Sequence, residues 1–388
     1  MPTPLPSILE VIPDWRERLE QIREIILANA VMFGEIPAPT FGEERRIRFL
    51  SDRFTEAGLS NVSIDEAGNG MAILPGKSGD GNILVLAHAD TVFAEVVDHA
   101  MSVGPDRITG PGIGDNSLGL AAVASLPTLL EQCGIELEHN LMLMGAVKSL
   151  GRGDLGGMRF FLEHNAQPIA AGVCVEGVHL GRLSFASLGM LRGEINVQLP
   201  EDMDWSAFTA KGAIVILNDI INKLLAVPLP SQPRTSIVLG SVNAGTSYNT
   251  RPLKAQLRFE VRSIQEGQVR QVQERIEEII DEVRAETEAE VRLEVLARRR
   301  PGGLAYGHPL VKGVRGIMDR LGIEPKIAPS TGELSELIVR GVPGVTLGLT
   351  TGEKIHDFTE SVDIEPVYKG LAQLIATIKA IDEGICDG

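Results

Sequence analysis

The sequence predicts an α/β protein with a mostly parallel sheet flanked by helices and an inserted β-α-β-β-α-β unit of the ferredoxin-like type. Three observations support this fold class. Short, continuously apolar runs alternate with amphipathic segments over most of the 388 residues, which is typical of strands buried between two layers of helices. Between about residues 190 and 300, strict alternation of apolar and polar residues replaces this pattern. Hydrophobic residues make up 44% of the chain but aromatic residues 4%, so aliphatic side chains must form the cores.

The first part of the larger domain is expected to span residues 1–189. Helical periodicity covers residues 14–32, and Thr40 and Glu43 have the spacing of a capping box at the start of a second helix. The stretch Asn82–Ala87 is apolar after its first residue and predicts a strand buried on both faces. Strands and helices then alternate, which predicts parallel pairing. Further strands are expected at 62–65, 71–74, 140–146 and 170–175, and further helices at 118–131 and 158–164.

Residues 190–300 are expected to form the inserted domain, and residues 301–388 the second part of the larger one. The inserted stretch predicts a strand, a helix, two strands, a helix and a strand, which is the ferredoxin-like order. These elements are expected at 192–199, 212–226, 236–243, 253–263, 266–287 and 290–297. The parallel-sheet pattern then returns, with a helix from residue 310, strands near 327 and at 344–349, and a helix at 366–381.

The charge of the chain argues against nucleic acid as a partner. The formal net charge is −16, and the basic run 298–300 is interpreted as the solvated end of a strand. Cys133, Cys174 and Cys386 are odd in number and far apart, which indicates reduced thiols. No signal-peptide pattern and no apolar stretch of membrane-spanning length is found. We therefore expect a cytoplasmic protein that binds neither nucleic acid nor a membrane.

Residue types that ligate metals occur where the predicted parallel strands end. His88, Asp115, Glu176 and His356 each lie just beyond a strand or at the start of the helix that follows. In an open parallel sheet, ligand-binding groups collect at the carboxyl ends of the strands. Two histidines and two carboxylates suit a zinc-type site, and Asp90 is spaced to orient His88 from behind.

Each of these residues also has a purely structural interpretation. A lone histidine at a strand end is more often a satisfied core residue, Asp115 has the position of a helix N-cap, and Glu176 could pair with a nearby arginine. Their combination at successive strand ends, in a chain with seven histidines, favours the metal site.

The wording and order of several motifs resemble the M20 family of zinc metallopeptidases and amidohydrolases, which includes glutamate carboxypeptidase, acetylornithine deacetylase and peptidase T relatives. The resemblance covers nearly the whole chain and implies a zinc-exopeptidase-like catalytic domain with an inserted lid that also forms a homodimer interface. It is carried by IPAPTFGEE (36–44), LAHADTVF (86–93), GPGIGDNSLG (110–119), GDLGGMR (153–159), GTSYNTRP (245–252), FEVRS (259–263) and IHDFTESVDIEPVYKGL (355–371).

The resemblance implies a role for each residue at the strand ends. His88 and Glu176 would hold one zinc ion, Asp115 would bridge two, His356 would hold the second, and Asp90 would orient His88. The peptide bond after Asp115 would be a non-proline cis bond.

The resemblance also implies that Asn249 and Arg262 contact the substrate, often through its carboxylate. The substrate class it implies is a small N-acyl amino acid or a short peptide.

Two acidic residues that this chemistry requires are missing. In the family, a Glu-Glu pair supplies the general base and a ligand for the second zinc, and the pair falls here on Ser149 and Leu150, or on Lys148 and Ser149. Either placement gives the same result, because no Asp or Glu occurs between Glu138 and Asp154. We therefore expect one zinc ion rather than two, with a metal-free chain as the remaining alternative, and the loss of roughly 10²- to 10⁴-fold in rate that a base contributes.

Two further positions are relevant to the missing glutamates. Glu333 falls in a loop that the family places near the active site and is a candidate replacement for the base. The family's lid histidine, which polarises the scissile carbonyl, has no counterpart in residues 200–205.

Three hypotheses follow from the sequence. The chain is a metal-dependent hydrolase of amide or peptide bonds with an altered site, or a catalytically inactive binding protein for a carboxylate-bearing ligand, or a structural dimer on an inherited scaffold. Ancestry favours the hydrolase, and the missing acids favour the binding protein.

Overall fold

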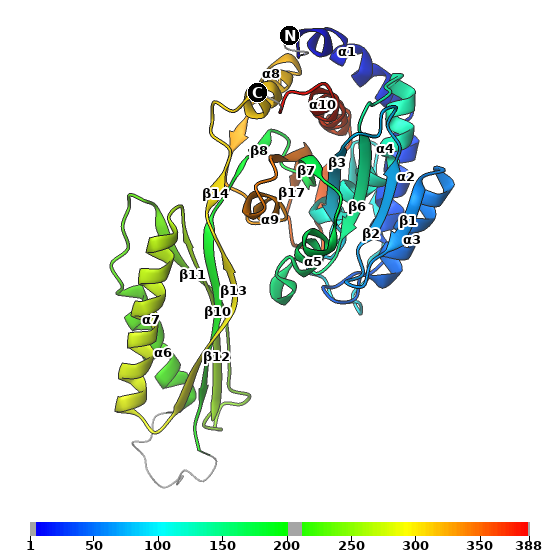
Figure 1. Cartoon of the computed structure of the whole chain (residues 1–388). Coiled ribbons are helices and arrows are strands. Elements are labelled where there is room, and N and C mark those ends of the chain that lie inside the picture. The colour runs from blue at the N-terminus through cyan, green and yellow to red at the C-terminus, as the bar shows by residue number, and fades with distance from the viewer. Residues whose placement is uncertain (1–4, 201–211, 387–388) are drawn as a thin grey trace. The chain divides into compact units, whose positions relative to one another are not determined.

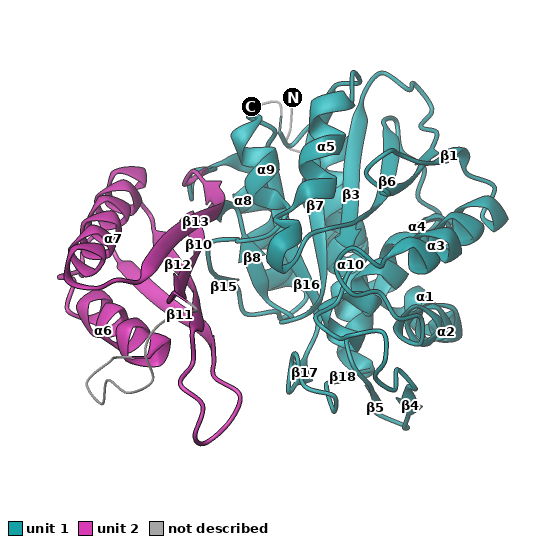
Figure 2. Cartoon of the chain, turned by 90° about the horizontal axis from the view of Figure 1, so that it is seen from below, with its two compact units in different colours: residues 1–186, 303–388 teal, residues 187–302 magenta. Residues whose placement is uncertain are grey.

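The computed structural model describes residues 5–200 and 212–386 and divides the chain into two compact units. Unit 1 consists of Met1–Ala186 and Gly303–Gly388, and unit 2 of Ser187–Gly302, as Figure 2 shows in teal and magenta. Each unit has a hydrophobic core of its own.

Unit 1 contains helices on both sides of an eight-stranded sheet (Figure 1). Its helices are α1 (Leu5–Gln21), α2 (Arg23–Gly34), α3 (Glu44–Glu56), α4 (Leu118–Cys133), α5 (Gly156–His164), α8 (Pro309–Arg320), α9 (Leu334–Val339) and α10 (Glu365–Asp382), with a π-helical turn at Ile113–Ser117 and a 3-10 turn at Gly151–Gly153. The strands of the large sheet are β1 (Ser60–Ile64), β2 (Gly70–Leu74), β3 (Asn82–His88), β6 (Asn140–Ala146), β7 (Ile169–Val178), β8 (Arg182–Ser184), β15 (Lys326–Ile327) and β16 (Gly344–Thr350).

The strand order of this sheet is β1-β2-β6-β3-β7-β16-β8-β15. Its four central strands, β6, β3, β7 and β16, are parallel, so their carboxyl ends lie along one edge. Short strands complete the unit at β4 (Ser102–Val103), β5 (Arg107–Thr109), β17 (Gly352–Glu353) and β18 (Ser361–Asp363), and β9 (Ala186–Ser187) and β14 (Gly302–Gly303) lie where the chain passes from one unit to the other. The observed sheet confirms the predicted α/β class.

Strand β3 shows why these residues form a buried strand. All seven of its residues are buried. Ile83 and Val85 pack into the core that contains α4 and α10, whereas Leu84 and Leu86 pack into the core on the side of α5 and α9. Because successive side chains point to opposite faces, a strand between two helical layers is apolar at nearly every position.

Unit 2 is an antiparallel sheet covered by two helices. It contains β10 (Gly189–Gln198), α6 (Ala213–Leu225), β11 (Thr235–Ala244), β12 (Lys254–Ser263), α7 (Glu266–Glu286) and β13 (Glu290–Arg299). The strand order β11-β12-β10-β13 is the ferredoxin-like order that the sequence predicts. Both helices bury an apolar stripe against the sheet, for example Ile216 and Ile220 from α6 and Ile276 and Ile280 from α7.

Two details of the first 60 residues differ from the prediction. The expected helix at 14–32 is two helices, α1 and α2, which are separated at Ile22. The expected capping box is wrong: α3 begins at Glu44, and the Thr40 hydroxyl donates to the Asp90 carboxylate at 2.8 Å instead of capping a helix. A tertiary hydrogen bond therefore replaces the local one.

None of the helices within the described ranges combines the length and apolar character needed to cross a membrane.

Candidate metal centre

Three structural elements bring the candidate ligands together at the carboxyl edge of the parallel sheet. His88 is the last residue of β3, Glu176 lies near the end of the neighbouring strand β7, and Asp115 lies in the turn that precedes α4. Asn116 pins this turn to β7, because its side-chain amide donates to the Val175 carbonyl at 2.8 Å and its oxygen accepts from the Gly177 amide at 2.8 Å. The peptide bond Asp115–Asn116 is cis, as the family resemblance implied.

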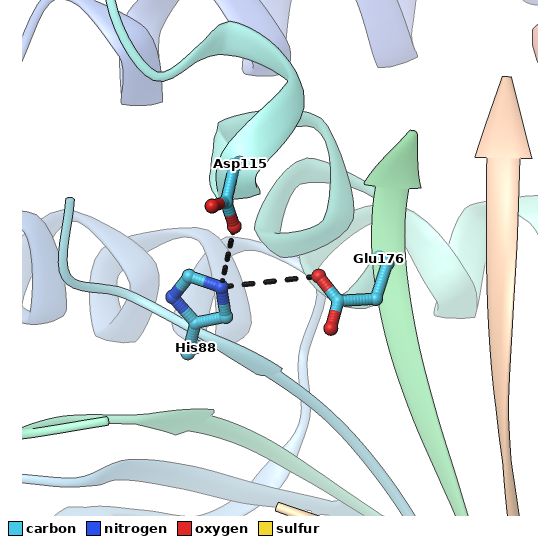
Figure 3. Close-up of side chains that lie close together, drawn as sticks. All are labelled: His88, Asp115 and Glu176. Atoms are coloured by element: carbon cyan, nitrogen blue, oxygen red, sulfur yellow. Dashed lines mark hydrogen bonds and ion pairs between the residues drawn. The ribbon is translucent and has the colours of Figure 1, made fainter. Parts of the chain in front are cut away.

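His88, Asp115 and Glu176 point toward one another (Figure 3). The His88 Nε2 atom is 2.9 Å from Asp115 Oδ1 and 3.9 Å from Glu176 Oε2. One ligand atom from each of the three residues lies within 4.8 Å of the other two. This separation allows all three atoms to bind a single ion once their side chains contract around it.

His88 is oriented through its other ring nitrogen. Its Nδ1 atom lies 2.9 Å from the backbone carbonyl of Asp90 and 3.5 Å from that residue's carboxylate. A carbonyl can only accept a hydrogen bond, so Nδ1 donates to it. Nε2 donates to Asp115 in the metal-free chain, and the loss of that proton would free its lone pair for a metal ion. Asp90 is therefore placed where we expected it, but its backbone makes the closer contact. Its carboxylate also accepts hydrogen bonds from Thr40, Ser149 and Leu150.

His356 contacts the other oxygen of the Asp115 carboxylate. Its Nε2 atom is 2.6 Å from Asp115 Oδ2, and its side chain is 56% exposed. Glu360 holds both residues in place: one carboxylate oxygen accepts from the Gly114 and Asp115 amides at 2.7 and 2.9 Å, and the other accepts from the His356 amide at 3.0 Å. Glu360 was not among the site residues predicted from the sequence. Its spacing of four residues from His356 was the available signal.

Neighbouring charges in the centre shift one another's pKa values. Burial alone would lower the pKa of His88, but hydrogen bonds to Asp115 and Asp90 outweigh burial and raise it well above its usual value. Burial would raise the pKa of Asp115, yet the two histidines lower it strongly. Burial raises the pKa of Glu176, although Arg182 opposes this effect from 3.4 Å. The structural interpretation of Glu176 as an ion-pair partner thus holds alongside its place in the cluster.

The donor set fits one zinc ion. One imidazole nitrogen and two carboxylates are the ligands of a catalytic-type zinc site. A second ion would have Asp115 and His356 as ligands, and no further His, Cys, Asp or Glu joins them in a metal-type group within the described ranges. His88, Asp115 and Glu176 would therefore hold the ion, and His356, the residue expected to hold a second ion, would lie beside it.

Zinc affinity is expected to increase as the pH rises above about 6.5, because the metal must displace the proton from His88 and is repelled by the proton on the neighbouring His356. Both pKa values are raised in the folded, metal-free chain, so these protons stabilise that chain below about pH 6.5, and their contribution is lost as the pH rises. Calorimetric titrations with zinc in buffers of different ionisation enthalpy would measure the proton release. An affinity that does not change over this range would contradict the assignment.

The segment that follows β6 holds no acid near this centre. Ser149 is 5% exposed, and its Oγ atom has no hydrogen-bond partner among the described atoms. Its amide and that of Leu150 donate to Asp90, and the Lys148 amide donates to Glu43 at 2.8 Å. The backbone is thus anchored beside the centre at the positions where the family resemblance implied two glutamates.

Glu333 lies in the turn directly before α9 and is the N-cap residue of that helix. It is 4% exposed, and its Oε1 atom has no hydrogen-bond partner among the described atoms. Burial is the main cause of the raised pKa values of Cys174 and Glu176, both on β7. The negative charge of Glu333 raises both pKa values further.

The two residues expected to contact substrate belong to unit 2. Asn249 lies in the exposed turn between β11 and β12, where its oxygen accepts from the Ser247 hydroxyl at 3.2 Å. Arg262 lies on β12 and donates to Glu260 at 2.8 and 2.5 Å. The stretch 201–205, which lacks the family's lid histidine, lies outside the described residues.

Comparisons of sequence identify a domain and distant relatives. Residues 206–288 match the M20 peptidase dimerisation domain. The chain is 23% identical to the LysW-lysine/LysW-ornithine hydrolase of Saccharolobus islandicus over 326 residues, which cover 80% of this chain and 86% of the relative.

Comparisons of structure show the fold of the M20 metallopeptidases. The di-peptidase Dug1p from Saccharomyces cerevisiae has a TM-score of 0.77 at 13% identity, and the similarity covers 99% of this chain and 100% of Dug1p. The YXEP protein of Bacillus subtilis, a dinuclear metal-binding peptidase from the M20 family, has a TM-score of 0.64 at 17% identity over 93% of this chain and 98% of that protein. The predicted resemblance is therefore confirmed for the fold and the dimerisation domain.

Proposed function

With an M20-type fold and dimerisation domain as the premise, we propose that this chain is a zinc-dependent hydrolase of amide or peptide bonds in small N-acyl amino acids or short peptides, with a single-metal centre and reduced turnover. The observation that carries the proposal is the convergence of His88, Asp115 and Glu176 within 4.8 Å at the carboxyl edge of the sheet. The hydrolase named among the sequence relatives supports the reaction class.

The side chains of the centre have distinct tasks in this proposal. A bound zinc ion would supply Lewis acidity toward a carbonyl oxygen and toward water. His88 presents Nε2 because the Asp90 carbonyl holds Nδ1, and Asp115 is aligned by the two hydrogen bonds that its turn donates to Glu360. His356 lies 2.6 Å from Asp115, and this contact raises the pKa of its imidazole. Asn249 and Arg262 stay candidates for contacts with a substrate carboxylate.

The missing glutamates define the second candidate function. The anchored backbone at Ser149 and Leu150 places no carboxylate beside the centre. A chain that binds a carboxylate-bearing small molecule or peptide without hydrolysing it would need the metal and the fold but no general base. For the dimerisation domain, we propose that it joins two copies of this chain.

The purified chain loaded with zinc is expected to retain about one ion, and Glu176→Gln is expected to lose most of it because the anionic ligand is replaced by a neutral amide. Elemental analysis measures the content, with His164→Ala as a control, since His164 is exposed on α5. A panel of N-acyl amino acids and dipeptides tests turnover. Two tightly held ions per chain, or unchanged zinc in Glu176→Gln, would contradict the proposed centre. Zinc binding without any turnover would favour the binding protein.

A further inference from the structure

A cavity of about 410 Å³ lies in unit 1, on the side of the large sheet that α5 covers. It is lined by β1, β2, β3 and β6, by α5 and by the loop that follows α5. The described residues that line it include none of the metal-type cluster, which is formed by His88, Asp115 and Glu176. Cavities of this volume usually hold small molecules, so this one is a candidate binding site separate from the metal centre.

The floor of the cavity is apolar and contains three methionines. Met71 on β2 lies directly opposite Met144 on β6, so both side chains point to the same face of the sheet. Ile73 and Met142 form the next such pair. The β6 side chains are buried and the β2 side chains are half-buried. Methionine adapts its shape to a neighbouring group, and its sulfur makes favourable contacts with aromatic rings, so this floor suits an aromatic ligand.

Helix α5 supplies an aromatic wall. The rings of Phe160 and His164 are stacked, with their centroids 4.0 Å apart and an interplanar angle of 23°. Phe161 is buried and adds a third ring. The His164 Nδ1 atom donates to the Phe160 carbonyl at 2.8 Å, so Nε2 of the neutral imidazole is an acceptor. A planar ring that enters the cavity would therefore meet aromatic side chains on one side and methionines on another.

The charged side chains of the cavity are both acidic. Asp65 and Glu66 belong to the turn between β1 and β2, and none of the described lining residues is Lys or Arg. The Asp65 carboxylate is fixed in place, because it accepts hydrogen bonds from the Gly68 and Asn69 amides, both at 2.9 Å, and from the Asn69 side chain at 2.7 Å. Glu66 is exposed. Two carboxylates without a basic neighbour in the cavity favour a cationic ligand over an anionic one.

We propose that this cavity binds an arylalkylamine, with the aromatic ring between the methionine floor and α5 and the ammonium group beside Asp65 and Glu66. The two parts of the cavity select the two parts of the ligand: the floor and the wall bury the ring, and the acidic turn attracts the cation. A carboxylate in place of the ammonium group would be repelled by both acids. The site is independent of the proposed hydrolase function, because it shares no residue with the metal-type cluster.

The test compares tryptamine with indole-3-propionate by calorimetric titration of the full-length protein, both zinc-free and zinc-loaded. The two probes carry the same ring on the same short chain and differ in the charge at its end. Tryptamine is expected to bind at least about tenfold tighter, because the sign of the interaction with two carboxylates reverses. Glu66→Gln is expected to reduce this ratio to about threefold. Met71→Trp, which fills the cavity, is expected to weaken tryptamine binding at least about tenfold.

Glu131→Gln is the matched control for the charge change, since Glu131 is exposed on α4, which packs on the other side of the sheet. Equal affinity for the two probes, or the same ratio in Glu66→Gln as in Glu131→Gln, would overturn the inference even if Met71→Trp does not fold. Unchanged tryptamine affinity in a folded Met71→Trp variant would place the ligand elsewhere and reject this cavity. Tryptamine binding that zinc abolishes would place the ligand at the metal centre, with the same consequence.

Discussion

Replacing Ser149 and Leu150 together with glutamate is expected to raise both the zinc content of the chain and its hydrolytic rate, the rate by roughly 10²- to 10⁴-fold. The first glutamate would supply a general base, and the second would add a ligand to the pair that Asp115 and His356 already form. The backbone is prepared for this change, because Asp90 already accepts hydrogen bonds from both amides.

The double glutamine variant, Ser149→Gln with Leu150→Gln, is the control, because glutamine matches glutamate in size but can neither accept a proton nor bind zinc as strongly. The zinc content is measured by elemental analysis. The hydrolytic rate is measured with the panel of N-acyl amino acids. A gain in the glutamine variant would show that shape rather than charge is responsible. The absence of any gain in the glutamate variant would show that the catalytic pair belongs elsewhere in the chain.

Replacing Arg46 with methionine is expected to lower the free energy of unfolding by about 3–5 kcal/mol. Arg46 lies on α3, is fully buried, and donates to the Ile36 carbonyl at 3.1 and 2.5 Å and to the Ala89 carbonyl at 3.0 Å. Burial lowers its pKa to about 10 against the opposing effect of Asp90 and Glu43, so it is charged at neutral pH. Methionine would leave two buried carbonyls without a donor and two acidic neighbours without their counter-charge.

The neighbouring residue provides the control for this variant. Arg45 is exposed on the same helix, so Arg45→Met changes the same residue type without removing a buried contact and should shift the stability by less than about 0.5 kcal/mol. Chemical unfolding of the two variants measures the difference. Because Ala89 lies between His88 and Asp90, Arg46→Met should also weaken zinc binding. Equal stability of the two variants would show that Arg46 is not needed to support this loop.

Elements with a strong local pattern were predictable from the sequence. The strand expected at 82–87 is β3 (Asn82–His88), and the helix expected at 266–287 is α7 (Glu266–Glu286). Continuous apolarity and 3.6-residue periodicity both reflect which faces are buried, so they can be recognised without knowing the partners. The capping box at Thr40 failed because the same hydroxyl has a better-placed partner in Asp90, which is 50 residues away in the chain.

The candidate metal centre also has a part that the sequence predicts and a part that only the tertiary structure decides. The chain order of strands and ligand-type residues was enough to place His88, Asp115 and Glu176 at the carboxyl edge of one sheet, because parallel strands bring their ends together. Only the folded chain established that their ligand atoms converge within 4.8 Å and that Glu360 fixes both Asp115 and His356. Such contacts join residues up to 245 positions apart and depend on the paths of loops, which no local periodicity records.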